Sequence, residues 1–159
     1  MADPAERSAT LVRHFERIER RHMQGLPILN PRLAVEAVGM RDFNEHRVLV
    51  LITPWFMNMV LFPESDAWAA SDQGSACDIE FPGEPLEFNV CHDTELGTYL
   101  TAALFRTMSD FPDQDTARAV AMEVVTRLFT VPAAADRPAG IKARNTLSRR
   151  SLLSGFGSR

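Results

Sequence analysis

Cysteine is scarce in this sequence of 159 residues, which contains Cys77 and Cys91 and no CxxC pair. Two cysteines are too few for a disulfide scaffold or for a zinc site built from cysteine alone. The four histidines are not clustered at metal-ligand spacing, so we expect no metal and no cofactor. A glycine-rich phosphate loop and the GxSxG and HExxH patterns are also absent. These absences argue against an enzyme.

Long hydrophobic runs are missing as well. The longest mostly apolar stretch is Val48–Phe62, and Pro54 and Asn58 interrupt it. It is shorter than the ~20 residues that a membrane-spanning helix needs. The N-terminal residues carry a helix signal and lack the apolar core of a secretory signal. We therefore expect a soluble cytoplasmic protein, without membrane insertion, whose two thiols are reduced.

Charge is unevenly distributed along the chain. Acidic residues exceed basic residues by 21 to 17, and the pI of about 5.6 argues against a general nucleic-acid-binding protein. Twelve acids but only one base, Arg106, lie between residues 63 and 115, whereas six bases and no acid follow Asp136. This predicts a single domain over 1–136 and a basic tail over 137–159. The acidic region either attracts a basic partner or is only a solvated surface.

Helix signals occur near both ends of the predicted domain. A capping-box pattern at residues 3–6, with Asp3 as N-cap, precedes apolar residues at helical spacing, and Gly25 then stops the helix. This predicts a helix over 4–23. Asp113 is a suitable N-cap for a second amphipathic segment, which Pro132 ends. A second helix is therefore expected over 113–129.

Six apolar segments separated by turn residues lie between the two helices. Their order predicts an α+β fold, with an antiparallel meander sheet of about five or six strands packed against an N-terminal and a C-terminal helix on one face. The predicted strands are Ala34–Phe43, Arg47–Thr53, Phe56–Phe62, Cys77–Phe81, Leu86–Cys91 and Tyr99–Met108.

The segment 52–63 has an unusual composition for a strand, because methionine and tryptophan alternate with β-branched residues. In a regular strand, residues 53, 55, 57 and 59 would share one face, subject to a slip at the proline. Methionine side chains are flexible and suit surfaces that bind varied apolar peptides. The alternative is an ordinary core strand. The predicted partner-binding residues are Thr53, Pro54, Trp55, Met57, Met59 and Phe62.

The C-terminal tail contains Ser148-Arg149-Arg150-Ser151-Leu152-Leu153, which matches the twin-arginine export consensus. A working signal stands at the N-terminus and precedes an apolar region. Only six residues follow Leu153, so we do not expect the motif to direct export of this chain. A chance match within a basic tail is the simplest interpretation.

A set of residues spread along the chain forms a recognisable pattern: Phe15-Glu16, Ile18, Arg20-Arg21, Met23, Leu26, Leu29, Pro31, Ile52-Thr53-Pro54-Trp55, Phe62-Pro63, Arg149-Arg150, Leu152-Leu153 and Gly155. This pattern resembles the HybE-type NiFe-hydrogenase assembly chaperones, and most of all their HupJ or HoxT branch. The resemblance extends over about residues 12–157. Some members of this family carry a fused rubredoxin module with CxxC pairs, which this chain lacks.

The resemblance implies a chaperone that binds the hydrogenase small subunit and its twin-arginine signal peptide, and that delays export until assembly is complete. The large subunit or another maturation factor is a further possible partner. The family supplies no residue-level site, so the assignment of Pro54 and Trp55 rests on our interpretation of segment 52–63. The arginine-pair tail could then be a pseudo-signal that occupies the client groove, or it could contact another partner instead.

Two other functions stay open at this point. One is a redox or iron–sulfur-protecting accessory factor that acts through Cys77 and Cys91. The other is an unrelated small-ligand domain with Trp55 in its pocket.

Overall fold

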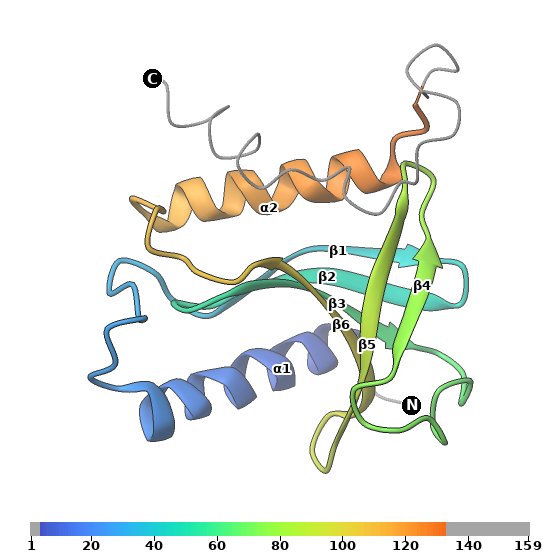
Figure 1. Ribbon diagram of the computed structural model, residues 1–159, viewed down its shortest axis with the longest axis horizontal. Coiled ribbons are helices and arrows are strands. Elements are labelled where there is room, and N and C mark those ends of the chain that lie inside the picture. The colour runs from blue at the N-terminus through green and yellow to red at the C-terminus, as the bar shows by residue number, and fades with distance from the viewer. Residues whose placement is uncertain (1–3, 133–159) are drawn as a thin grey trace.

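The computed structural model describes residues 4–132 and contains two helical segments around one sheet (Figure 1). Both predicted helices are confirmed. The N-terminal one is α-helical and ends in one π-helical turn, η1. In the C-terminal one the Asp113 side chain accepts the Thr116 N–H at 2.8 Å, whereas Asp3 lies outside the described residues. The elements are α1 Pro4–Ile18, η1 Glu19–Met23, β1 Glu36–Phe43, β2 His46–Ile52, β3 Met57–Pro63, β4 Ala76–Glu80, β5 Pro85–Asp93, β6 Gly97–Phe105 and α2 Gln114–Phe129.

The six strands form one antiparallel sheet in the order β1-β2-β3-β6-β5-β4. The predicted α+β fold with a six-stranded antiparallel sheet is thus confirmed. The sheet consists of two three-stranded meanders, joined where β3 pairs with β6. Because the segment between β3 and β4 carries the chain to the far edge, β4 lies at one edge of the sheet and β1 at the other.

The two helices cover opposite faces of the sheet, so our expectation that both lie on one face is wrong (Figure 1). Alternate residues of β2 belong to two separate apolar clusters: Val48 and Val50 pack in the larger one with α2, and Leu49 and Leu51 pack in the smaller one with Leu11 of α1. Both faces of β2 are therefore buried, and each needs its own covering layer.

The end of α2 is anchored to the turn between β4 and β5. The N–H of Gly83 in this turn donates a hydrogen bond of 2.7 Å to the carbonyl of Leu128. A Cβ atom at position 83 would lie 2.0 Å from the Arg127 carbonyl oxygen, so the approach requires glycine. The described chain therefore leaves α2 next to the β4–β5 hairpin.

Candidate partner-binding groove

The predicted partner-binding residues lie mostly in the interior. Met57 and Met59 are fully buried in the cluster beneath α2, and Phe62 is buried in the cluster beneath α1. Thr53 and Pro54 are also buried. The exposed methionine face expected for this segment does not form, because β3 is a central strand with both faces covered, which is the core-strand alternative. Of the predicted set, only Trp55 is half-exposed.

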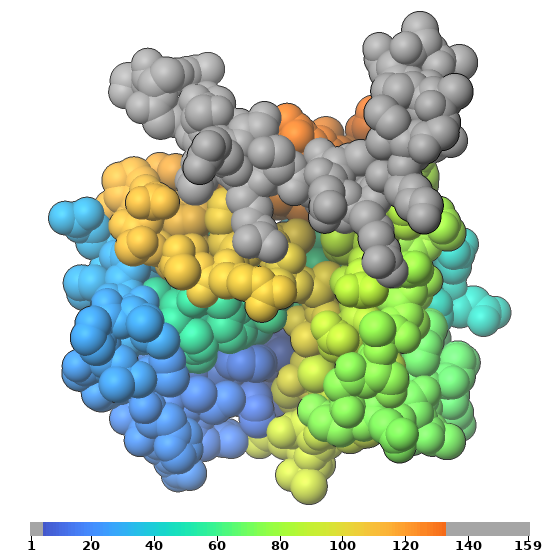
Figure 2. Space-filling view, viewed as in Figure 1, coloured from blue at the N-terminus to red at the C-terminus, as the bar shows by residue number. Residues whose placement is uncertain are grey.

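Trp55 lines a surface groove of about 560 Å³. The groove is also lined by the connector of residues 27–32, which follows η1, and by Arg106, Thr107 and Ser109 after β6. Figure 2 shows the surface recessed between the connector and the segment that follows β6. Ile28 in the groove is 58% exposed and the neighbouring Leu26 is 43% exposed, so the site offers apolar surface to a partner.

A buried asparagine, Asn30, holds the three segments of the groove together. Its side-chain amide donates hydrogen bonds to the carbonyls of Met108 and Phe111, at 2.9 and 2.8 Å. Its own N–H donates to the carbonyl of Pro54 at 2.9 Å, and its side-chain oxygen accepts the N–H of Arg32 at 3.0 Å. Because this one residue bonds the connector both to the loop before Trp55 and to the segment after β6, the groove is a preformed feature of the fold.

The Thr53 hydroxyl shapes the loop that presents Trp55. Its oxygen accepts the N–H of Trp55 at 3.2 Å and of Phe56 at 2.9 Å, and the hydroxyl donates to the Phe56 carbonyl at 3.0 Å. Phe56 then packs edge-to-face against Phe15 of α1, with 5.6 Å between ring centroids. Thr53 is itself buried, so it positions Trp55 through these backbone hydrogen bonds and does not reach the surface.

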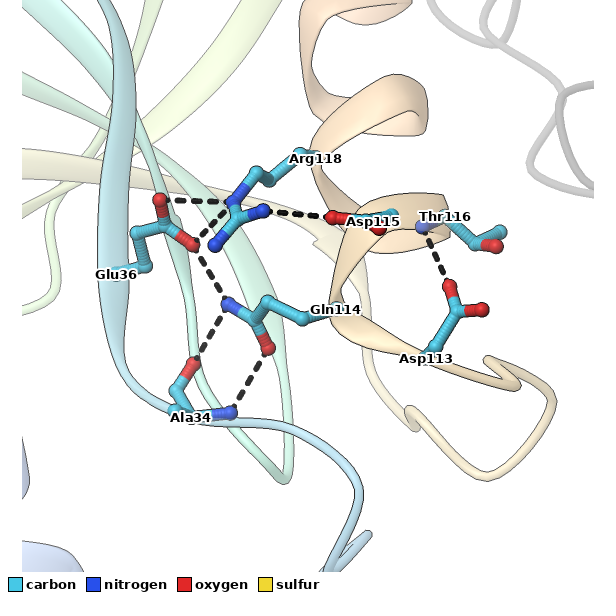
Figure 3. A network of polar contacts seen from close by, with 7 residues as sticks. All are labelled: Ala34, Glu36, Asp113, Gln114, Asp115, Thr116 and Arg118. Atoms are coloured by element: carbon cyan, nitrogen blue, oxygen red, sulfur yellow. Dashed lines mark hydrogen bonds and ion pairs between the residues drawn. The ribbon is translucent and has the colours of Figure 1, made fainter.

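A second polar network fixes Ala34 and Glu36, which follow the connector, to α2 (Figure 3). The Gln114 side chain accepts the N–H of Ala34 at 2.9 Å and donates to the carbonyl of Ala34 at 3.2 Å and to Glu36 at 2.8 Å. Arg118 donates to Glu36 at 2.8 Å and pairs with Asp115 at 2.7 Å. Residues 30–36 are thus held at both ends, which keeps the groove wall in place.

The acidic residues of 63–115 do not gather on one face. Asp93 at the end of β5 and Glu95 in the turn that follows pair with His14 and Arg17 of α1, and the hydrogen bond from Arg17 lowers the pKa of Glu95. A separate exposed group lies on the edge hairpin: Asp78, Glu80 and Glu87. In Figure 1 this β4–β5 hairpin stands at the right, whereas the connector lies at the left.

The rim of the groove carries positive charge instead. Arg32 and Arg106 both line it and are both exposed, and no ion pair of either is found within residues 4–132. Sequence reasoning missed Asn30, Ile28 and Arg32, although the connector contributed Leu26, Leu29 and Pro31 to the family resemblance. The available signal is the pair of prolines around Asn30, which indicates an extended connector but does not identify the groups that Asn30 contacts.

The two cysteines do not form a reactive pair. Cys77 is the cross-strand partner of Phe88, on the α2 side of the sheet, whereas Cys91 is three residues further along β5 and lies on the other face. Burial raises the pKa of both thiols, which disfavours the nucleophilic thiolate. This geometry disfavours the redox alternative. No cluster of metal-ligating side chains occurs in the part of the chain that the structure describes.

Two further expectations concern the basic tail and membrane insertion. The tail residues Arg149, Arg150, Leu152 and Leu153 lie outside them, so their role stays a prediction. Within the described part, none of the helices is both long and apolar enough to cross a membrane.

Comparison with known proteins identifies the family. The family model of the NiFe-hydrogenase assembly chaperone HybE matches residues 6–155. The chain is 35% identical to the hydrogenase expression/formation protein HupJ of Bradyrhizobium diazoefficiens, over 97% of this chain and 90% of the relative. It is 38% identical to HoxT of Azotobacter vinelandii, over 86% and 90% of the two chains.

The fold agrees with that assignment. The solution structure of HybE from Escherichia coli matches with a TM-score of 0.65 over 86% of each chain, at 24% identity. The chain thus belongs to the HybE family of NiFe-hydrogenase assembly chaperones.

Proposed function

We propose that this hydrogenase maturation chaperone acts in the cytoplasm, where it binds the small subunit of a NiFe-hydrogenase through its twin-arginine signal peptide and delays export until assembly is complete. The observation that carries the proposal is the preformed groove beside Trp55 and Ile28. A twin-arginine signal consists of a basic pair followed by an apolar segment. The groove offers exposed apolar surface to that segment, and bound apolar side chains would be removed from water there.

The edge hairpin β4–β5 is the proposed contact for the arginine pair. Asp78 and Glu87 are direct cross-strand partners, so two like charges oppose each other on the exposed face. Exposed carboxylates, among them those of Asp78 and Glu80, attract a basic client segment. Arginine suits this role because its guanidinium can donate several hydrogen bonds to carboxylates.

The direct test is titration of a labelled small-subunit signal peptide into the full chain, beside the same peptide with both arginines replaced by glutamine. Saturable binding that the replacement weakens is expected. Ile28→Ala should weaken binding by about 1–2 kcal/mol, or about five- to thirtyfold in Kd. Met122→Ala is the matched control, because Met122 is 46% exposed on α2 outside the groove.

The acidic contact has its own pair of variants. Asp78→Asn with Glu80→Gln should weaken binding of the arginine peptide and leave the glutamine peptide unaffected. Asp66→Asn with Asp72→Asn removes the same charge from the exposed segment between β3 and β4, and serves as the control. Equal binding of both peptides by every variant would contradict arginine recognition at this hairpin.

The basic tail is a proposed internal competitor for this contact. The described chain leaves α2 beside the β4–β5 turn, where the Gly83 N–H bonds to the Leu128 carbonyl, so the end of α2 lies close to the acidic hairpin. A short tether can give an effective concentration in the ~millimolar range. Deleting 140–159, or changing Arg149→Gln with Arg150→Gln, should then tighten peptide binding. Unchanged or weaker binding would reject self-competition and favour a contact with another partner.

A further inference from the structure

The rim of the groove is positively charged, whereas the β4–β5 hairpin, which is the other proposed client contact, is acidic. Arg32 projects from the connector and Arg106 directly follows β6, and the two line the same groove as Ile28 and Trp55. Both arginines are exposed, and neither has an ion-pair partner among residues 4–132. The site therefore combines apolar walls with two cations that no carboxylate of the described chain neutralises.

This arrangement disfavours a basic occupant. A client arginine placed in the groove would meet like charges at its rim, and like-charge juxtaposition opposes binding. The chain's own tail carries six bases and no acid after Asp136, so it is repelled from the groove for the same reason. A client segment with an anionic group beside an apolar side chain is not repelled by the two arginines.

The groove also has the form needed for selective recognition. Asn30 joins its three segments through hydrogen bonds of 2.8–3.0 Å, so its walls are in place before a partner arrives. A preformed site loses little conformational freedom on binding. The guanidinium groups at the rim present planar donors that match a carboxylate, and they can take up a bidentate geometry.

We propose that this groove binds a client segment in which large apolar side chains are followed by carboxylates, with the apolar part against Trp55 and Ile28 and the carboxylates against Arg32 and Arg106. The identity of the client rests on the proposed function, but the chemistry of the groove does not. The carboxylates belong to a part of the client other than its arginine pair. The chaperone then recognises two regions of opposite charge.

Three fluorescein-labelled peptides test the chemistry with the full chain. They share a Leu-Leu-Phe core and differ only in the next two residues, which are Glu-Glu, Gln-Gln or Lys-Lys. The Glu-Glu peptide should bind about three- to tenfold more tightly than the Gln-Gln peptide, as two partly exposed ion pairs allow. Because the pairs are near the surface, added salt should reduce this preference.

Variants at the rim assign the effect to the two arginines. Arg32→Gln with Arg106→Gln should abolish the preference for the Glu-Glu peptide while binding of the Gln-Gln peptide persists. Arg32→Glu with Arg106→Glu should reverse it in favour of the Lys-Lys peptide. Arg13→Gln with Arg20→Gln is the matched control, since it removes two exposed positive charges from α1 and η1 and should leave the preference intact.

Several outcomes would overturn the proposal. Equal affinity for the Glu-Glu and Gln-Gln peptides, or a preference that survives in the rim variants, would do so. Absence of binding by all three peptides would also refute it, as would sedimentation showing that Ile28→Glu disrupts a dimer, since a second copy would then occupy the groove. The signal-peptide titration is read separately, so loss of the arginine effect there contradicts the proposed function without bearing on the groove.

Discussion

Replacement of Asn30 by alanine tests whether this residue holds the groove together. Asn30→Ala removes two donated hydrogen bonds, to the carbonyls of Met108 and Phe111, and one accepted from the Arg32 N–H. Each is worth about 1 kcal/mol net, and a carbonyl left buried without a partner costs more. We expect a loss of about 2–4 kcal/mol in the free energy of unfolding, or about 5–15 °C in Tm.

Urea denaturation followed by circular dichroism measures this loss. Asn89→Ala is the matched control, because Asn89 is exposed and its side chain donates to the Gly74 carbonyl alone, at 3.1 Å. It should cost less than about 1 kcal/mol. Equal losses for the two variants would refute the assignment of Asn30 as the clamp of the groove.

A third variant, Asn30→Asp, separates the hydrogen bonds from packing. It keeps the shape of the side chain but replaces the donor amide with an acceptor that faces two carbonyl oxygens. At neutral pH we expect it to be at least as destabilising as Asn30→Ala. Burial beside carbonyls raises the pKa of the introduced carboxyl above its unfolded value, so its relative stability should improve as the pH falls. A pH-independent loss would contradict this account.

Three further variants test other contacts. Gly83→Ala should lower the free energy of unfolding by about 1–3 kcal/mol, because its Cβ would lie 2.0 Å from a carbonyl of α2; an unchanged Tm would contradict this. Glu95 has a folded-state pKa lowered by Arg17, so its stabilisation is present at neutral pH and lost on acidification. The stability difference between wild type and Glu95→Gln should shrink as the pH falls from 7 to 3 in urea titrations. Cys77→Ser with Cys91→Ser should retain signal-peptide binding in the titration of the labelled peptide, and loss of that binding would favour the redox alternative.

The elements of the fold were predictable from the sequence because their signals are local. Asp113 caps α2 as expected, and the apolar segments became the six strands within a few residues. The pairing of β3 with β6 and the placement of the helices were not predictable by the same reasoning. They depend on contacts between residues far apart in the chain. One local signal for the helix placement did exist: Val48–Ile52 of β2 is a continuous apolar run, which is typical of a strand covered on both faces, and all five residues are buried.

The candidate site was predicted only in part, and for a related reason. The spacing of methionines in 53–59 is identical for an exposed edge strand and a buried central strand, so composition alone could not place Met57 and Met59. Trp55 is half-exposed because it lies in the turn that Thr53 shapes between β2 and β3, outside both strands. The groove itself needed the meeting of three segments at Asn30, one of which, after β6, contributes Met108 and Phe111 from 78 and 81 residues away.

If this chaperone binds a twin-arginine segment as proposed, the placement of charge restricts how that segment lies on it. Its arginine pair is attracted to Asp78, Glu80 and Glu87 on the edge hairpin and repelled by Arg32 and Arg106 at the groove. These surfaces lie toward opposite ends of the molecule in Figure 1. If one extended segment contacts both, its basic end must face β4–β5 and its apolar part must point toward Trp55. The opposite direction places the arginine pair against Arg32 and Arg106 and the apolar part against the acidic hairpin, so the charges favour one direction of binding.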